Sequence, residues 1–357
     1  MDAIAELRLE GNPGYPHNTQ FSTNAKLLEE YGNRIVDIVA ERLKLWCQPE
    51  LMNWDPTQLV QFDYHDPVAV FIKNEPHSLK KVREKRWRCI FGIGVIDQLC
   101  ERVLLRSIVQ AFESPTETGV NCGSMVKLGF SDELASCIGK HYHDRLKRFP
   151  DCKPVSTDVK NWDGTVSTEM MSSVVEILTA GASTQWAIAL RNWCYMTTNV
   201  LYALPGGIIV KREGKSGMMP SGSFGTTYFN TLMRVMLSAE VGGKSRMAMG
   251  DDCIDFVPFS VEQLIHNYAQ HGVEIHDVET PGHHAFTFCS HYFMCQDPTS
   301  ETWICALATW KKAINRFLTK GNRGQSGEEF QAVQYELRHN PPEVVDLLLK
   351  VFNEHLQ

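Results

Sequence analysis

The alternation of apolar and polar residues predicts strands mainly in the middle third of the chain, with helices on both sides. Short apolar runs predict strands at 68–73, 154–158, 246–249 and 253–257, a short hairpin or strand near 286–294, and a hairpin at 200–210. Apolar residues at helical spacing predict helices at 25–46, 95–112, 167–180, 226–240 and 261–271, and more helices from Trp303 onward. This order is not a regular βαβ repeat, so we expect an α+β fold.

Composition narrows the class of protein. The 357 residues are 43% hydrophobic and 22% charged, which is typical of globular proteins, and the length predicts two or three subdomains. No run of about 18 apolar residues is present, so we expect no membrane-spanning helix. The N-terminus lacks the pattern of a secretory signal, and the eleven cysteines contain no CxxC. We therefore expect a soluble, intracellular protein with reduced, mostly buried thiols.

Positive charge is concentrated in one segment. The net charge of −7 argues against a protein coated in nucleic acid, yet the segment from Lys73 to Arg88 holds seven Lys and Arg against two Glu. A solvated helix face is the ordinary explanation of such a run. The alternative is phosphate binding: Arg86 and Arg88 would share one side of an extended segment, where guanidinium groups fit a triphosphate. The residues of the run that could contact template phosphates are Lys80, Lys81 and Arg83.

Two acidic motifs suggest a metal site. Gly250-Asp251-Asp252 lies between two apolar runs and predicts a hairpin with carboxylates at its tip, although such residues are common in turns. Asp158 ends another predicted strand and could complete a carboxylate cluster for two Mg²⁺ ions about 4 Å apart, as in phosphoryl transfer. Asp163 follows five residues later, and a helix N-cap is an equally good interpretation of it.

A glycine-rich segment, 216–225, leads into the helix predicted at 226–240. Thr226 and Asn230 are four residues apart and therefore share a helix face, where they could bind a ribose 2′-OH. A helix cap with buried polar residues is the alternative.

In this order and spacing the four elements resemble the viral RNA-dependent RNA polymerases. The matching residues are Lys73-Asn-Glu75 with Arg86-x-Arg88 in the fingers, Asp158-x4-Asp163 in the first palm motif, Ser221-Gly222-x3-Thr226-x3-Asn230 in the second, and Gly250-Asp-Asp252 in the third. Segments 272–279 and 286–291 are similar to the fourth and fifth palm motifs. The sequences of these segments are most similar to those of polymerases from the sobemovirus, polerovirus and barnavirus group of positive-strand RNA viruses. Asn12-Pro-Gly-Tyr-Pro16 resembles that group's template-entry motif. The resemblance covers roughly residues 12–320.

The resemblance implies roles for individual residues. Asp158 and Asp251 would be the main metal ligands, supported by Asp252. Asp163 and Asn230, helped by Ser221 or Thr226 beside Gly222, would sense the ribose 2′-OH. Lys73, Arg86 and Arg88 would bind the incoming triphosphate. The family often has a lysine in the fourth palm motif as proton donor to pyrophosphate, and here the comparable residue is His276, for which a surface histidine is an equal alternative.

The resemblance also implies a right-hand polymerase with an antiparallel palm sheet. Fingers would occupy 1–150, the palm 151–300 with a fingers insertion at about 181–215, and a small helical thumb 301–357. The implied reaction is RNA-directed RNA synthesis from nucleoside triphosphates, with two Mg²⁺ or Mn²⁺ ions and release of pyrophosphate. Implied partners are template and nascent RNA, nucleoside triphosphates and a viral genome-linked protein as primer. We expect replication in the host cytoplasm, in membrane-associated complexes that the chain joins through partners, because it has no anchor of its own.

Other classes of protein stay open at this point. A reverse transcriptase shares the palm chemistry, but it generally blocks the 2′-OH with a bulky side chain. A non-catalytic RNA-binding or scaffold protein could keep the fold, although the retained carboxylates argue against it. A local cluster of His and Cys residues also suggests zinc, but without a standard ligand spacing, and packed palm residues are the better interpretation. The cluster consists of His283, His284, Cys289, His291 and Cys295.

Overall fold

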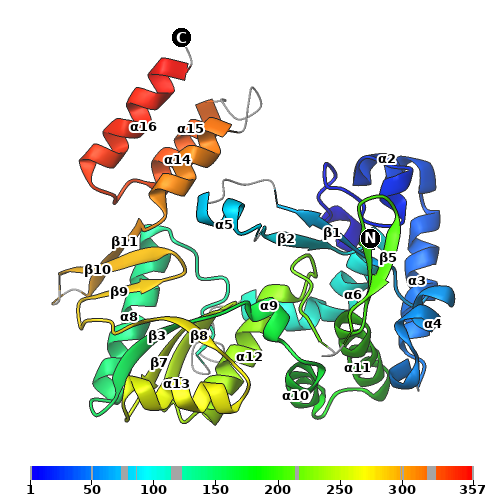
Figure 1. Ribbon diagram of the computed structural model, residues 1–357, viewed down its shortest axis with the longest axis horizontal. Coiled ribbons are helices and arrows are strands. Elements are labelled where there is room, and N and C mark those ends of the chain that lie inside the picture. The colour runs from blue at the N-terminus through cyan, green and yellow to red at the C-terminus, as the bar shows by residue number, and fades with distance from the viewer. Residues whose placement is uncertain are drawn as a thin grey trace. The chain divides into compact units, whose positions relative to one another are not determined.

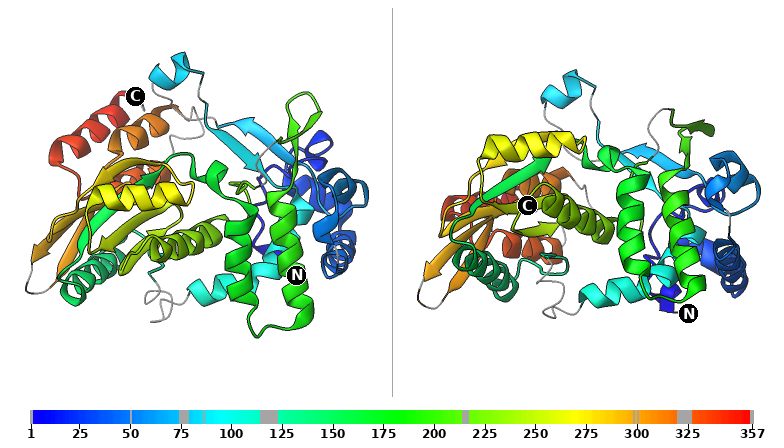
Figure 2. Two further views of the ribbon diagram at one scale, coloured as in Figure 1. Left: turned by 60° about the horizontal axis from the view of Figure 1, so that its bottom comes forward. Right: turned by 90° about the horizontal axis from the view of Figure 1, so that it is seen from below.

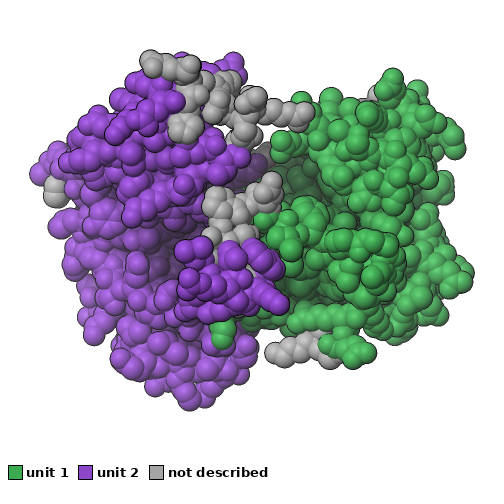
Figure 3. Space-filling model, turned by 45° about the horizontal axis from the view of Figure 1, so that its top comes forward, with its two compact units in different colours: residues 1–73, 88–114, 159–237 green, residues 74–87, 115–158, 238–357 purple. Residues whose placement is uncertain are grey.

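The computed structural model describes residues 2–49, 51–73, 79–85, 87–113, 123–213, 217–297, 299, 301–319 and 327–355. The chain forms two compact units, which Figure 3 distinguishes by colour. Unit 1 comprises residues 1–73, 88–114 and 159–237, and unit 2 comprises residues 74–87, 115–158 and 238–357.

Unit 1 is mostly helical and contains one four-stranded sheet of order β2-β1-β4-β5 (Figure 1). Its strands are β1 (Val68–Ile72), β2 (Cys89–Gly92), β4 (Leu201–Leu204) and β5 (Ile208–Lys211). Its helices are α1 (Asp2–Ala5), α2 (Asn24–Tyr31), α3 (Arg34–Trp46), α4 (Pro56–Gln61), α6 (Val95–Glu113), α9 (Trp162–Thr165), α10 (Thr168–Thr179), α11 (Thr184–Thr198) and α12 (Thr226–Glu240), with 3₁₀ turns at His17–Thr19 and Leu51–Asn53. The predicted hairpin is confirmed, since β4 and β5 pair antiparallel around Gly206 and Gly207, both with positive φ.

The helix predicted over 25–46 is two helices. Thr23 caps the first, α2, by accepting a hydrogen bond from the Lys26 backbone, and Gly32 ends it with a φ of +53°. The second, α3, begins two residues later at Arg34. The apolar spacing continues across the break, so it does not reveal the interruption, whereas a glycine at this φ ends α2. The helix predicted at 167–180 is confirmed as α10, whereas α11 was not predicted; the two helices lie side by side as a pair (Figure 2).

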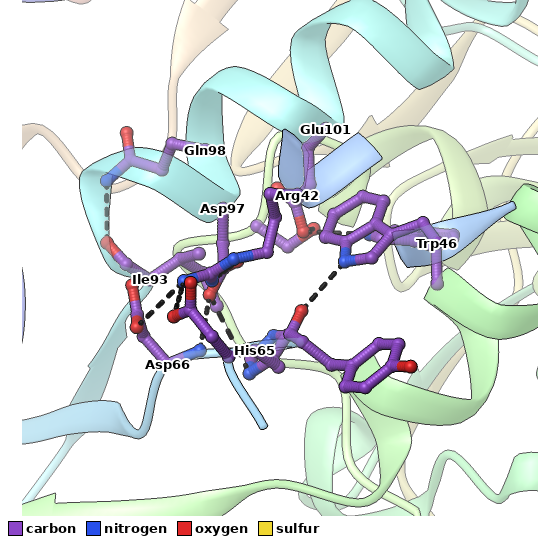
Figure 4. A network of polar contacts seen from close by, with 12 residues as sticks. Arg42, Trp46, His65, Asp66, Ile93, Asp97, Gln98 and Glu101 are labelled. Carbon is purple, nitrogen blue, oxygen red and sulfur yellow. Dashed lines mark hydrogen bonds and ion pairs between the residues drawn. The ribbon is translucent and has the colours of Figure 1, made fainter. Parts of the chain in front are cut away.

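A buried ionic network joins α3 to α6 (Figure 4). Arg42 of α3 donates hydrogen bonds to Asp97 of α6 at 2.7 Å and to Asp63. Asp97 also accepts one from the Asp66 backbone at 2.8 Å. Burial, followed by the neighbouring Asp97 carboxylate, raises the pKa of Asp66. The network therefore fixes the segment just before β1, the strand that leads to Lys73.

Unit 2 contains a four-stranded sheet of order β6-β7-β3-β8. Its strands are β3 (Lys153–Val159), β6 (Ser245–Met249), β7 (Asp252–Val257) and β8 (Ile275–Glu279). Helix α13 (Val261–Gln270), yellow in Figure 2, lies against one face of this sheet. The other face carries Met247, Ile254 and Phe256, which pack into one core with Tyr142 and Phe286.

A second sheet of unit 2 has the order β11-β10-β9, formed by β9 (Ala285–Phe288), β10 (His291–Asp297) and β11 (Thr302–Leu307). The prediction of helix from Trp303 onward is wrong for β11. Trp303 and Cys305 alternate with less buried residues, and Trp303 packs so closely on α8 (Asp132–Arg148) that a side chain at Gly139 would collide with its ring. Strand alternation over so few residues is easily taken for the start of the amphipathic helix that follows.

The remaining elements of unit 2 are helical: α5 (Leu79–Arg83), α14 (Trp310–Thr319), α15 (Gly327–Glu336) and α16 (Pro342–His355). The last three share a small core around Phe317, Phe330 and Leu348. Within the described part of the chain, no helix has both the length and the apolar character needed to cross a bilayer. The ten cysteines described are free thiols, and four of them are fully buried while Cys89 is exposed. Five of the ten are only partly buried, so the prediction that most thiols are buried is wrong for this set.

Candidate active site

The predicted metal carboxylates lie together at one end of the β6-β7-β3-β8 sheet. Strands β3 and β7 pair antiparallel with Thr157 opposite Cys253, so Asp158 and Asp252 follow at adjacent positions of the two strands. Strands β6 and β7 pair up to Met249 opposite Asp252, which leaves Gly250 and Asp251 as a two-residue turn. Gly250 has a φ of +65°, which glycine adopts without strain. The predicted hairpin with carboxylates at its tip is confirmed.

A buried carboxylate that the sequence analysis missed supports these strands from behind. Asp255 of β7 is completely buried and accepts hydrogen bonds from Thr157 Oγ1 at 3.2 Å and from the Tyr268 hydroxyl at 2.8 Å. The Cys253 thiol lies 3.6 Å from its other oxygen, Oδ1. Asp255 therefore links β7 to β3 beside Asp158 and to α13 behind the sheet. A polar residue within the apolar run Cys253–Val257 was the signal that could have revealed it.

Cys289 and His291 of the His/Cys cluster do not lie together on one strand. Cys289 lies in the two-residue turn between β9 and β10, where it and Ser290 have positive φ, whereas His291 begins β10. Burial and the nearby carboxylates of Asp252 and Asp251 raise the pKa of Cys289 well above its usual range. His291 stacks on Phe130 at 3.8 Å between ring centres. These contacts are those of packed palm residues, which was the preferred interpretation.

A divalent-metal site would be formed by hard oxygen ligands. Among the residues described, no group of three or more His, Cys, Asp or Glu side chains is already gathered around a common point. Asp158 and Asp251 are exposed, Asp252 is partly exposed, and all three lie at one sheet end, so the donor set is of the kind that Mg²⁺ and Mn²⁺ prefer. The carboxylates fit a metal site in chemistry and in strand position.

In unit 1, Asp163 lies in the first turn of α9 and is not a helix N-cap. Asn161, with a φ of +53°, occupies that position for α9, and Ser167 caps α10 by accepting a hydrogen bond from the Met170 backbone at 3.2 Å. The Asp163 carbonyl accepts a hydrogen bond from the Met219 backbone at 3.1 Å. The N-cap interpretation is therefore wrong, and the chain around Asp163 is joined to the glycine-rich segment.

The glycine-rich segment is held as a defined loop before α12. Thr226 Oγ1 donates to the carbonyls of Pro220 at 2.9 Å and Ser223 at 2.8 Å, which closes the loop. The Phe91 amide of β2 donates to Ser221 Oγ at 3.3 Å. A side chain at Gly222 would come within 2.3 Å of the Phe91 carbonyl oxygen, so glycine is required there. Ser221 stays exposed, whereas the hydroxyl of Thr226 serves the loop itself.

Asn230 has the feature expected of a ligand-binding amide. It is buried, with 5% of its surface exposed, and its Oδ1 has no hydrogen-bond partner among the residues described. Buried amides are normally satisfied, so this oxygen is a candidate for a ligand contact.

The basic run is described only in part. Lys73 follows β1 and its amide donates to the Arg88 carbonyl at 2.8 Å, so these two residues of unit 1 are held on neighbouring strands. Arg86 and the Asn74-Glu75 part of the motif lie outside the described residues, as does the side chain of Lys81. Lys80 and Arg83 of unit 2 are exposed on the short helix α5.

His276 lies on the edge strand β8, which neighbours β3 in the sheet. Its side chain is 64% exposed, and its Nε2 is 3.9 Å from the Asp277 carboxylate. Nothing in its surroundings decides between a proton donor and a surface histidine.

Comparison with known proteins agrees with these motifs. A family model described as "Viral RNA-directed RNA-polymerase" matches residues 142–302, which include both acidic motifs and the loop before α12. The RNA-directed RNA polymerase of Mushroom bacilliform virus is 27% identical over 98% of this chain and 84% of its own length. Replicase polyprotein P2AB of Southern bean mosaic virus is 28% identical over 89% of this chain, and Protein P1-P2 of Pea enation mosaic virus-1 is 27% identical over 99% of it. In sequence, this chain is similar to viral RNA-directed RNA polymerases.

The fold agrees as well. The solved Sicinivirus 3Dpol RNA dependent RNA polymerase superposes with a TM-score of 0.72 over 97% of this chain and 72% of its own, at 16% identity. The solved RNA-dependent RNA polymerase of a "human picorbirnavirus" superposes with a TM-score of 0.70 over 98% of this chain. The right-hand polymerase fold and the group of relatives predicted from sequence are thus confirmed. The chain spans 32% and 30% of the Southern bean mosaic virus and Pea enation mosaic virus-1 proteins.

Proposed function

We propose that this chain catalyses template-directed RNA synthesis during replication of a positive-strand RNA virus. The observation that carries the proposal is the strand register, which brings Asp158 and Asp252 to adjacent positions, with Asp251 in the turn beside them. Adjacent carboxylates repel each other, and a fold that keeps them together without a cation gains nothing from it. This argues for catalysis over a non-catalytic scaffold.

Asp158 and Asp251 would bind two Mg²⁺ or Mn²⁺ ions, supported by Asp252. When bound, such ions activate the attacking primer hydroxyl and stabilise charge on the leaving pyrophosphate. The chain's own residues supply the rest: Lys73, Arg86 and Arg88 would hold the triphosphate by charge-assisted hydrogen bonds. His276 would donate a proton to the pyrophosphate, so His276→Gln should lower the turnover rate and leave RNA affinity unchanged.

Ribose selection would involve Asp163, Ser221 and Asn230. The Oδ1 of Asn230 is an acceptor without a partner among the described residues, and a ribose 2′-OH can donate to it. Thr226 would act indirectly by closing the loop that carries Ser221. Selection of ribose is the feature that separates this proposal from a reverse transcriptase.

The partners would be template RNA, nascent RNA and nucleoside triphosphates, with a genome-linked viral protein as a candidate primer. Lys80, Lys81 and Arg83 would contact RNA phosphates. We also propose that the chain acts in the host cytoplasm, in membrane-associated complexes reached through other viral proteins.

The test is incorporation of labelled nucleotides on a short RNA template with Mg²⁺ or Mn²⁺. The proposal predicts template-dependent product from ribonucleotides and little from deoxyribonucleotides. Product from deoxyribonucleotides alone would support a reverse transcriptase. Salt-sensitive RNA binding by folded protein, with no synthesis from primed or unprimed template, would support a non-catalytic protein.

A further inference from the structure

A second buried carboxylate contacts the loop that carries Ser221. Glu101 lies in the middle of α6 and is 1% exposed. Its Oε1 accepts hydrogen bonds from Ser223 Oγ and from Trp193 Nε1, both at 2.9 Å, and its Oε2 accepts one from the Phe224 amide at 2.7 Å. Asp97, of the ionic network described above, projects from the same helix (Figure 4).

Burying a carboxylate is costly unless hydrogen bonds compensate for the lost hydration. Two of the three donors to Glu101, Ser223 and Phe224, belong to the loop 220–225, so the carboxylate and the loop conformation depend on each other. Leucine or methionine in place of Glu101 would suit the apolar face of α6 better, so packing alone does not explain the residue.

The loop is held from several sides. The Arg102 guanidinium lies over the Phe224 ring, 5.0 Å from its centre. Gly225 packs so tightly that a side chain there would approach Leu105 to 2.9 Å and Trp193 to 3.1 Å. Glu101 is the one of these residues whose contacts are directed hydrogen bonds to the loop backbone and hydroxyl, and these set the loop's orientation as well as its position.

We infer that Glu101 is a positioning residue that holds the loop 220–225 in the conformation in which Ser221 meets the ribose of the incoming nucleotide. The inference rests on the proposed function, because it concerns the recognition of the same nucleotide. Glu101 does not contact substrate itself; it acts through Ser223 and Phe224, the residues directly after the exposed Ser221 and Gly222.

The proton on Glu101 should matter to this role. Burial raises the pKa of Glu101 to about 7, although its three hydrogen bonds act in the opposite direction. The titratable groups that interact with it are Asp97, Cys100 and Arg102, all on α6, whereas its contacts from α11 and the loop are hydrogen-bond donors. The ionised form accepts from all three donors, but the protonated form must point its O–H at one partner and loses an acceptor site. These hydrogen bonds favour the ionised form, so the loop should be held best above pH 7, although burying that charge lowers the stability of the whole fold there.

The experiment compares Glu101→Gln with wild type and with Glu169→Gln, an exposed carboxylate on α10. Hydrogen exchange of the 217–226 peptide reports the hydrogen bonds from the loop to Glu101, called the clamp below, without requiring activity. In Glu101→Gln the Phe224 amide should exchange about tenfold faster, because the amide side chain cannot accept from all three donors. Unchanged exchange would overturn the clamp, whatever the activity of the wild type.

The positioning role needs a kinetic readout as well. In Glu101→Gln the KM for a ribonucleotide should rise about tenfold, and discrimination against its 2′-deoxy analogue should fall, with a smaller change in kcat. In wild type the KM should rise as the pH falls below 7, and this rise should be absent in Glu101→Gln. Glu101→Asp should restore part of the discrimination. If exchange is faster in Glu101→Gln but its KM, discrimination and pH profile equal those of wild type, Glu101 has a structural role and no positioning role. An inactive wild type with the expected exchange difference would reject the proposed function and leave the clamp intact.

Discussion

The hydroxyl of Tyr268 donates a hydrogen bond of 2.8 Å to Oδ2 of Asp255, a completely buried carboxylate of β7. Thr157 donates to the same oxygen from β3. Thr157 precedes Asp158, and Asp255 lies three residues after Asp252. The contact therefore joins the two strands that carry the proposed metal carboxylates to α13, which packs on them.

Removing this hydrogen bond should destabilise unit 2. Tyr268→Phe leaves the Asp255 oxygen with one donor fewer in a buried site, and we expect a loss of about 1–3 kcal/mol in the free energy of unfolding. Urea unfolding measures the loss. Tyr292→Phe is the control, because this tyrosine is 43% exposed, and its effect should stay within about 0.5 kcal/mol. Equal stability of both variants would mean that the hydrogen bond contributes nothing.

Asn230 should be needed for ribose selection but hardly for stability. Because its Oδ1 has no partner among the described residues, Asn230→Ala should change the free energy of unfolding by less than about 1 kcal/mol. The preference for a ribonucleotide over its deoxy analogue should fall by about tenfold.

The matched control for that variant is Asn192→Ala. Asn192 is also buried, but its Nδ2 donates to the carbonyls of Trp46 at 2.8 Å and Gln48 at 2.7 Å. Its loss should cost about 2–3 kcal/mol of stability and leave the ribose preference unchanged. The opposite pattern in the two variants would remove Asn230 from the nucleotide site.

The raised pKa of Glu101 predicts a pH dependence of stability. Between the ordinary value of 4.5 and the folded value of about 7, the folded state binds the proton more tightly than the unfolded state. The contribution of this group to stability is therefore full below pH 4.5 and is lost as the pH rises through 7, by about 3 kcal/mol. Glu101→Gln has no such group, so its unfolding free energy should fall less than that of wild type between pH 5 and pH 8. Parallel curves would contradict the assigned shift.

Salt should report the phosphate contacts of α5. If Lys80 and Arg83 each contact a phosphate, each alanine variant should weaken RNA binding and lower the slope of log affinity against log salt by about one. Filter binding at several salt concentrations measures the slope. Lys44→Ala is the control, since Lys44 is an exposed residue of α3 that pairs with Glu41 at 2.6 Å. A slope equal to that of wild type would exclude both residues from the RNA contact.

The sequence was most informative where local pattern and chemistry coincide. The hairpin that carries Asp251, the strand that ends near Asp158 and the helix Thr226–Glu240 were predicted closely, because each has a distinct apolar period and a clear turn signal. The break at Gly32 was not predicted, since the apolar spacing continues across it. The strand at Trp303 was not predicted either, since a short apolar segment fits more than one period.

The supporting carboxylates could not be assigned from sequence. Asp255 stands inside an apolar run and Glu101 inside an amphipathic helix, and an acidic residue in either place predicts an exposed face or a buried hydrogen-bonded group. Only the folded chain brings Tyr268 to Asp255, and Ser223 to Glu101, from distant segments. Asp163 shows the converse: the sequence allowed an N-cap, but the short helix α9 begins two residues too early for it.

The most direct test of the central claim is single-nucleotide extension of a primed RNA template at increasing Mg²⁺ concentrations. Wild type should extend the primer at a rate that rises with Mg²⁺ and saturates. Asp158→Asn and Asp251→Ala should each lower that rate by at least about a hundredfold, because each removes a carboxylate from the proposed metal site. Asp151→Asn, an exposed carboxylate just before β3, should extend like wild type. Extension by both site variants at the wild-type rate would contradict the assignment of the metal carboxylates and, with it, the account of catalysis.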